Sequence, residues 1–319
     1  RIKESAAVLW KIYVGLTLGE VLILKLVNST LPWFDAFTIA FSNLSTGGFT
    51  IKNGSIASYN HAGMEWVILL FMILGSINFT HYYYLLKGKL YKIFEPELFV
   101  YLISLLVGSF IMVLTLYLPE GGEIHSSGVE HFSFGKALRY GIFQLVSAQT
   151  STGFSTADYE MWPYLNQVLL FIVMYLGSMA GSTGGGMKIA RHFLLAKFFF
   201  KELESVYRPE VVKGVKVGGA FIYNKVESAI LGFFFSIVAL SIIGTFLFIM
   251  DGLDPQTALG VNGCMINNVG IAFRAAGPSQ SFAFLPAAST LISILWMILG
   301  RLEFLGVLVF FIPRFWKKY

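Results

Sequence analysis

The sequence predicts an all-α polytopic membrane protein, and its composition, its apolar runs and its charge pattern all support this class. Hydrophobic residues make up 56% of the 319-residue chain and charged residues only 13%, and the mean hydropathy is +0.70. This composition lies far outside that of ordinary soluble domains. Apolar runs of about 20 residues, long enough for a helix to cross about 30 Å of hydrocarbon, recur along the chain. Basic residues gather at alternate ends of these runs.

The apolar runs predict six membrane spans, of which the fourth is interrupted. They cover residues 6–27, 64–86, 97–117, 164–200, 222–250 and 284–311. Most lysines and arginines lie near the two ends of the chain, in the 87–96 connection and in the 188–225 segment. By the positive-inside rule these parts, including both ends of the chain, are cytoplasmic. The basic residues therefore indicate a solvated surface under the membrane rather than a nucleic-acid partner.

The N-terminus and the single cysteine add two further expectations. The chain begins with Arg1 rather than Met, and its first residues lack the form of a signal peptide, so we expect it to be part of a longer chain. Cys264 is the one cysteine, which rules out an internal disulfide and a cysteine-based metal site. The redox compartment stays undetermined.

Three connections on the side opposite the basic residues share one design. They are WFDAFTIAFSNLSTGGFT (33–50), KALRYGIFQLVSAQTSTGFST (136–156) and DPQTALGVNGCMINNVGIAF (254–273). Each is a half-hydrophobic segment of roughly 12 residues, too short to cross a bilayer, that ends in a polar cluster with a glycine. The clusters are Ser45, Thr46, Gly47 and Gly48; Thr150, Ser151, Thr152 and Gly153; and Asn267, Asn268, Val269 and Gly270. One unit of span, short helix, polar loop and span is therefore repeated.

These short segments are predicted to be re-entrant helices that enter the membrane from outside and turn back. Non-helical backbone is tolerated at membrane depth only where it is buried in protein or lines a water-filled path. Glycine permits the positive φ that turns consecutive carbonyls toward one axis, and a ring of carbonyls can replace the hydration shell of an ion. Any single loop could be an ordinary turn, but three equivalent loops favour a cation-conducting pore.

These residues resemble the Trk/Ktr/HKT superfamily of potassium transporters, most closely the membrane subunit of bacterial Trk systems. STGGF, TSTGF and NNVGI look like the selectivity filters of the second, third and fourth of four channel-like repeats. GSMAGSTGGGMKIAR (177–191) looks like the broken span of the third repeat, and GRLEFL (300–305) like the last span. The resemblance implies a pseudo-fourfold pore with potassium at the filter, in a multi-pass protein of the bacterial inner membrane.

Only three of the four repeats have a counterpart here, so we expect the missing repeat to precede Arg1. The expected parts of the chain are a repeat over 1–92 with filter 45–49, a repeat over 93–200 with filter 150–154, a cytoplasmic connector over 201–220, and a repeat over 221–319 with filter 267–271. The first filter, which in the resembled family influences the choice between potassium and sodium, is among the missing parts.

The glycine run GSMAGSTGGGMK (177–188) must interrupt its span, because each glycine costs a helix about 1 kcal/mol relative to alanine. A phosphate-binding loop is excluded by Met187, which separates the last glycine from Lys188, and by Ile189 at the hydroxyl position. A flexible polar loop below the filter could block the permeation path, and the resemblance implies an intramembrane gate here. The candidate gate residues are Gly181, Ser182, Thr183, Gly184, Gly185, Gly186 and Lys188.

Arg301 is a charged residue within the last apolar span, where a charge is costly and usually functional or paired. An ion pair with Glu303 or a side chain reaching the interface would account for it. The resemblance adds a role, because the family places an arginine here that faces the gate loop and the cavity. In that position Arg301 would repel cations.

The favoured function is uptake of a monovalent cation through a gated channel-like pore, and potassium is the favoured cation. A sodium-permeable member of the same superfamily and an alternating-access transporter of a small solute are the alternatives. An enzyme is not expected, since the spans show no nucleophile with a base and no metal cluster. No cofactor is expected beyond potassium as substrate. The resemblance implies a homodimer and a cytosolic ring of nucleotide-binding regulatory subunits.

Overall fold

The computed structural model describes residues 2–118, 132–208, 214–217, 220–221, 224–302, 306–307, 309 and 313–316. Its α-helices are α1 (Ile2–Val27), α2 (Trp33–Leu44), α3 (Ala62–Ser76), α4 (Phe79–Leu86), α5 (Pro96–Tyr117), α6 (Phe134–Gln149), α7 (Tyr164–Leu176), α8 (Ile189–Tyr207), α9 (Asn224–Met250), α10 (Pro255–Asn267) and α11 (Ala287–Leu302). Short 3₁₀ turns cover Ser55–Tyr59, Leu90–Lys92, Tyr159–Met161, Arg274–Ala276, Phe282–Phe284 and Pro313–Trp316. The predicted helical membrane fold is confirmed.

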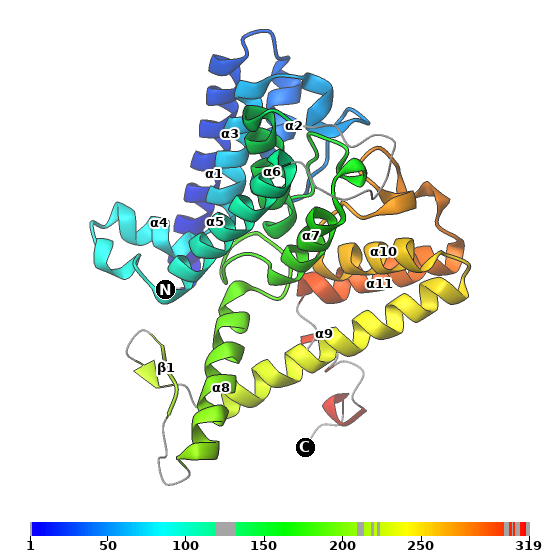
Figure 1. The fold of residues 1–319 in the computed structure, drawn as a ribbon. Helices are drawn as coiled ribbons and strands as arrows, with labels where there is room; N and C mark the ends of the chain where they lie inside the picture. The colour runs from blue at the N-terminus through cyan, green and yellow to red at the C-terminus, as the bar shows by residue number, and fades with distance from the viewer. Residues whose placement is uncertain are drawn as a thin grey trace.

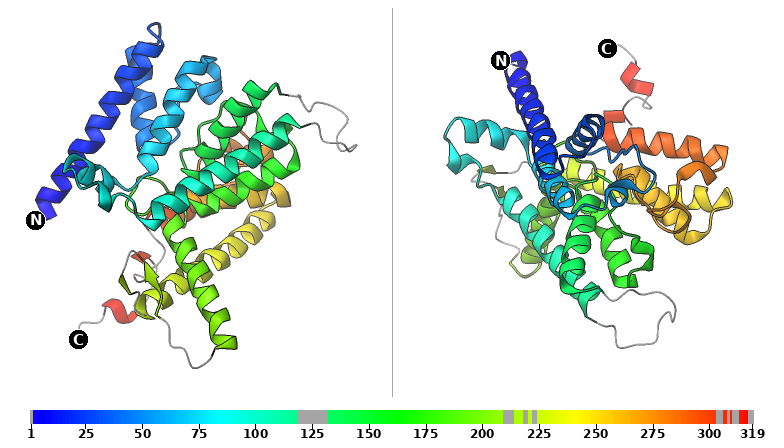
Figure 2. Two further views of the ribbon diagram at one scale, coloured as in Figure 1. Left: turned by 60° about the vertical axis from the view of Figure 1, so that its left-hand side comes forward. Right: turned by 90° about the horizontal axis from the view of Figure 1, so that it is seen from above.

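The helices form successive groups in which a short helix follows a longer one. Helices α2, α6 and α10 are short and lie within the segments 33–50, 136–156 and 254–273, where short helices were expected. Seen from above, the segments coloured blue to cyan, green and yellow to orange lie around a common centre (Figure 2). Helix α8 leaves this body, and α9 returns beneath α10 and α11 (Figure 1).

Among the described residues, three helices are long and apolar enough to span a membrane unaided: Ala6–Val27, Pro96–Tyr117 and Lys225–Met250. They match the first, third and fifth predicted spans. The predicted span over 64–86 is bent, because α3 and α4, which are together long and apolar enough to span a membrane, meet at an angle of 90°. The predicted interruption of 164–200 is confirmed, since α7 ends at Leu176 and α8 begins at Ile189.

The bend between α3 and α4 has a local cause in the residues 76–78. Ile77 adopts an extended conformation, with φ −82° and ψ 148°, which stops α3. The side chain of Asn78 then accepts a hydrogen bond from the backbone N–H of Thr80 at 2.9 Å and caps the start of α4. Asparagine is among the best residues at this position, so the apolar run continues while the helix does not.

The buried core divides between the first two groups of helices and the last. One cluster contains Leu24, Ile39, Met64, Tyr101 and Phe143, among others, from α1 to α6. A second cluster joins α9, α10 and α11 through residues such as Phe248, Val261 and Trp296. Long apolar side chains on the outer faces, such as Leu106 and Phe110 of α5, stay exposed, as expected for helices that face lipid.

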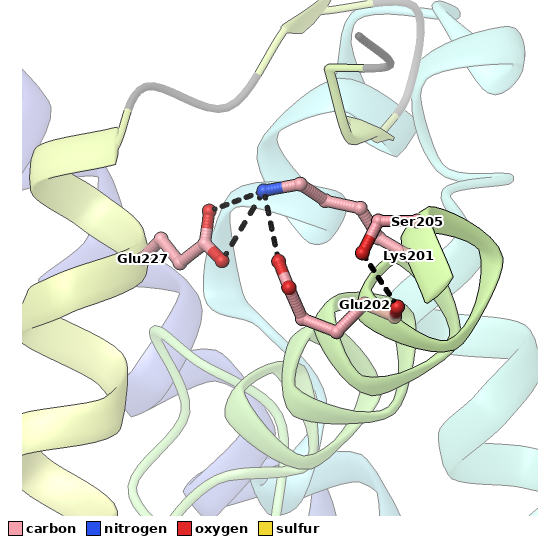
Figure 3. Close-up of polar contacts among 4 residues, drawn as sticks. All are labelled: Lys201, Glu202, Ser205 and Glu227. Atoms are coloured by element: carbon pink, nitrogen blue, oxygen red, sulfur yellow. Dashed lines mark hydrogen bonds and ion pairs between the residues drawn. The ribbon is translucent and has the colours of Figure 1, made fainter. Parts of the chain in front are cut away.

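The segment between α8 and α9 contains a short hairpin. Helix α8 ends at Tyr207, and β1 (Lys216–Val217) pairs antiparallel with β2 (Ala220–Phe221). Lys201 ties the far part of α8 to α9, because its Nζ lies 3.1 Å from Glu227 Oε2 and 3.7 Å from Glu202 Oε1 (Figure 3).

Candidate functional site

The three polar clusters that follow α2, α6 and α10 have the same backbone conformation. Thr46, Ser151 and Asn268 have positive φ values of 52°, 56° and 55°. Two residues later Gly48, Gly153 and Gly270 have φ values of 67°, 82° and 89°. The repeat read from the sequence is therefore also a repeat of local structure, and we call these segments the three turns.

Hydrogen bonds end the three short helices in the same way. The backbone N–H groups of Gly47, Thr152 and Val269 donate to the carbonyl oxygens five residues earlier, at 2.8, 3.0 and 3.0 Å. The acceptors are Ser42, Ser147 and Cys264. This six-to-one pattern with a left-handed residue closes a helix C-terminus and satisfies its free carbonyls. The partial negative charge of each helix end is thereby brought to its turn.

The turns lie directly against one another. A Cβ atom on Gly48 would overlap the carbonyl oxygen of Thr152, and a Cβ atom on Gly153 would overlap the carbonyl oxygen of Val269. Glycine is therefore required at both positions by close approach as well as by φ. The first turn adjoins the second and the second adjoins the third, so the turns form consecutive sides of one ring.

The ring is open beside the third turn. A Cβ atom on Gly270 would meet nothing within 4 Å. A cavity of about 650 Å³ lies between the first and third turns, lined by Ser45, Thr46, Asn268 and Gly270 and, from α11, by residues that include Arg301. The open side therefore separates the first turn from the third.

The described groups around the ring are oxygen-rich and buried. Thr150, Thr152 and Asn267 have no exposed surface, and Ser151 is 1% exposed. The hydroxyls of Thr150 and Thr152 lie 2.8 Å apart, and Ser151 Oγ donates to the Thr150 carbonyl at 2.6 Å. Hydroxyl and carbonyl oxygens held together in this way suit a partly dehydrated monovalent cation.

The loop between α7 and α8, residues 177–188, lies against all three turns, and we call it the crossing loop. Thr46 Oγ1 donates to the Thr183 carbonyl at 2.8 Å. The N–H of Gly185 donates to Ser151 Oγ, and a Cβ atom on Gly185 would overlap the Asn267 carbonyl oxygen. The sequence-predicted gate residues thus meet the sequence-predicted filter residues in every repeat present.

Three of the predicted gate residues, Ser182, Gly184 and Lys188, make contacts within the crossing loop. Ser182 Oγ lies 2.8 Å from Ser178 Oγ and donates to the Met179 carbonyl at 2.6 Å. Lys188 has a positive φ of 71° and its Nζ donates to the Gly184 carbonyl. A lysine in this region of conformational space is uncommon, so the surrounding contacts must hold it there.

The bend between α3 and α4 supports the crossing loop from the other side. Thr183 N–H donates to the Gly75 carbonyl at 3.4 Å, and Met179 N–H donates to the Ser76 carbonyl at 3.2 Å. In return, Phe79 N–H donates to the Gly181 carbonyl at 3.1 Å. Two interrupted helices therefore satisfy each other's free backbone groups. The sequence signal for this support was Asn78, a capping residue inside an apolar run.

Arg301 lies near the first turn rather than on the crossing loop. Its Nη2 is 3.4 Å from the Ser45 carbonyl oxygen, and the side chain is exposed to the cavity. Among the described residues Arg301 makes no other hydrogen bond. The expected contact with the crossing loop is therefore not seen. Glu303, the alternative partner, lies outside the described residues.

Short helices that end in matching turns, together with an interrupted helix pair against those turns, are the features of a helical membrane protein. The comparison with family models agrees. The model described as "TrkH: Cation transport protein" matches residues 1–318, and the chain belongs to this family.

Known proteins extend this result. The Trk system potassium uptake protein TrkH of Halomonas elongata is 32% identical over 320 residues, which cover 100% of this chain and 64% of the relative. TrkH of Salmonella typhimurium is 31% identical over the same shares. The crystal structure of the potassium transporter TrkH from Vibrio parahaemolyticus superposes with a TM-score of 0.89 at 28% identity, covering 99% of this chain and 66% of that one. The chain thus spans about 64% of the length of these curated relatives.

Proposed function

We propose that this chain forms three sides of a gated pore through which a monovalent cation, potassium, enters the cell. The observation that carries the proposal is the set of three equivalent turns, each at a helix C-terminus, that abut around one centre. Both relatives are named as potassium uptake proteins, and we propose potassium as the ion for this chain because of that similarity.

In the proposed mechanism the turns replace water around the ion. Carbonyl oxygens such as those of Thr152 and Val269 would coordinate it, while the C-terminal ends of α2, α6 and α10 add a favourable field. Buried hydroxyls hold the turns in shape, so little reorganisation is needed when the ion arrives. The filter residues are those of the three polar clusters from Ser45 to Gly48, Thr150 to Gly153 and Asn267 to Gly270.

A fourth repeat would complete the pore. The open side next to Gly270 and the cavity of about 650 Å³ between the first and third turns supply the place for it. The relatives are longer than this chain, of which it spans about 64%, and the expected position of the fourth repeat is before Arg1. The repeat boundaries expected from the sequence, after residues 92, 200 and 220, belong to the same proposal.

The crossing loop is the proposed gate. Its contacts with Thr46, Ser151 and the Asn267 carbonyl bring its backbone against all three turns, which supports this role. A hydrated ion could pass only after the loop moved away. Arg301, beside the Ser45 carbonyl, would add a positive charge to the cavity wall and so repel cations.

The cellular setting follows the family. The chain is a multi-pass membrane protein of a bacterial transport family. We propose the inner membrane, with both ends cytoplasmic, on the charge pattern of its connections. A homodimer and a cytosolic nucleotide-binding regulatory ring are proposed on the likeness to Trk systems.

Ion flux through the full-length protein in liposomes tests the pore. Gly153→Ala should lower rubidium flux about fivefold to hundredfold and reduce the preference for rubidium over sodium, because the added Cβ overlaps the Val269 carbonyl and overpacking costs about 1–3 kcal/mol. Gly232→Ala on α9, where a Cβ meets nothing within 4 Å, is the matched control. Wild-type flux and preference in Gly153→Ala would contradict the filter role.

Two further arms of this experiment sharpen the result. Arg301→Ala should raise the flux of both ions, and a lower flux in folded protein would contradict its role as a barrier. Equal sodium and rubidium flux in the wild type would favour the sodium-permeable alternative. Uptake of a neutral solute that saturates, without ion current, would favour the alternating-access alternative.

A further inference from the structure

Glu97, in the first turn of α5, reaches the crossing loop from outside the ring. Its Oε1 accepts a hydrogen bond from the backbone N–H of Ala180 at 2.6 Å. The two residues are 83 positions apart in the sequence. Glu97 therefore makes a side-chain contact to the crossing loop that is independent of the three turns.

The bond between Glu97 and Ala180 is of a strong kind. A backbone N–H that donates to a carboxylate is charge-assisted, and such bonds are roughly twice as strong as neutral ones. One carboxylate thus holds the beginning of the loop directly.

A cavity of about 450 Å³ adjoins this contact. It is lined by residues 91, 92 and 94–97, which include Lys92, Glu95 and Glu97, and by Ala190 and Phe193 from the first turns of α8. If the loop left Glu97, water in this cavity could solvate the carboxylate, so release would not strand a charge in an apolar site. The hydrogen bond between Glu97 and Ala180 can therefore break as well as form.

We propose that Glu97 is a latch that holds the crossing loop against the turns, and this rests on the proposed gate function of that loop. Glu97 is a positioning residue, since it touches the loop backbone and none of the turn residues that would bind the ion. Breaking the latch frees the Ala180 end of the loop. Release then shifts the loop from its position across the ring toward an open one, while the turns and their ion preference stay unchanged.

Hydrogen exchange at the Ala180 amide in the full-length protein tests the latch without reference to conduction. Glu97→Ala should speed this exchange about tenfold or more, as expected for loss of one charge-assisted bond. Glu97→Gln keeps a carbonyl acceptor of the same size and should give a smaller increase, which also covers the case in which Glu97→Ala does not fold. Glu95→Ala removes an exposed carboxylate from the same cavity and should leave the exchange unchanged.

Rubidium and sodium flux measured on the same variants separates the latch from the gate. Flux should be lowest in the control Glu95→Ala, higher in Glu97→Gln and highest in Glu97→Ala. The ratio of rubidium flux to sodium flux should be the same in all three variants. Wild-type exchange at Ala180 in both Glu97 variants would overturn the latch. Faster exchange with wild-type flux would leave the contact established but would overturn the gate function of the loop, and with it the proposal that Glu97 controls conduction.

Discussion

Two spans of this protein are interrupted, and they are interrupted in different ways. The break between α3 and α4 is two residues long, contains no glycine and is capped by its own Asn78. The break between α7 and α8 is 12 residues long, contains five glycines and depends on contacts from other parts of the chain. The first is a fixed bend, whereas the second is a segment whose position other elements decide.

The difference shows how a membrane protein can support a movable segment. Backbone groups freed at the α3–α4 bend, such as the Gly75 and Ser76 carbonyls, accept from the crossing loop. Unsatisfied backbone groups at membrane depth cost several kcal/mol each. The break between α3 and α4 therefore provides hydrogen-bond partners for the longer break, and substitutions in the two breaks should have separable effects.

The largest effect is expected from replacing Gly184, Gly185 and Gly186 together with alanine. The added Cβ atoms would lie 2.9 Å from the Thr150 carbonyl oxygen and would overlap the Asn267 carbonyl oxygen, and Gly186 has a φ of 73°. Overpacking costs about 1–3 kcal/mol. Rubidium flux in liposomes should therefore rise at least about fivefold, and the preference for rubidium over sodium should be unchanged. Gly15→Ala, which meets nothing within 4 Å, is the control. Unaltered flux in the triple variant would refute the gate.

A smaller effect is expected from Asn78→Ala, which removes the cap of α4. Loss of an N-cap costs about 0.5–2 kcal/mol, so the melting temperature of the protein in detergent should fall by a few degrees. Asn78→Ser, which keeps a capping oxygen, should restore most of the loss. If the alanine and serine variants melt alike, the bend does not depend on the cap.

The smallest effect is expected from Thr183→Val. This change keeps the shape of the side chain and removes the hydrogen bond from Thr183 Oγ1 to the Gly75 carbonyl, which measures 2.9 Å. A neutral hydrogen bond contributes about 0.5–1.5 kcal/mol, so flux should rise by a factor of roughly two to ten. The serine variant keeps the hydroxyl and serves as the control. A decrease in flux would show that the bond stabilises the open position instead.

The sequence predicted the three turns well, because each carries its own local signal. A short apolar segment followed by a polar cluster with glycine specifies a helix end and a positive φ, and Gly48, Gly153 and Gly270 all have it. The same holds for the break at 177–188, where glycines exclude a helix. These features depend on neighbouring residues and can be read without knowledge of the fold.

Other features could not be read because they depend on distant partners or on a weak signal. The run 64–86 contains a single glycine, Gly75, and no proline, so Asn78 was the one residue that indicated the bend. The bond between Glu97 and Ala180 joins residues 83 positions apart. The adjacency of Gly48 to Thr152 and of Gly153 to Val269 likewise exists only in three dimensions. The hydrogen bond of Arg301 to the Ser45 carbonyl is likewise a contact with a distant residue.

The ion pair between Lys201 and Glu227 has a mechanical consequence. Helix α8 starts directly after the crossing loop, and a helix of 19 residues is a stiff rod of about 28 Å. Lys201, which lies more than halfway from Ile189 to Tyr207 along α8, forms the ion pair with Glu227 of α9. A displacement of the Tyr207 end would therefore tilt α8 about this ion pair and move Ile189, next to the crossing loop, in the opposite direction.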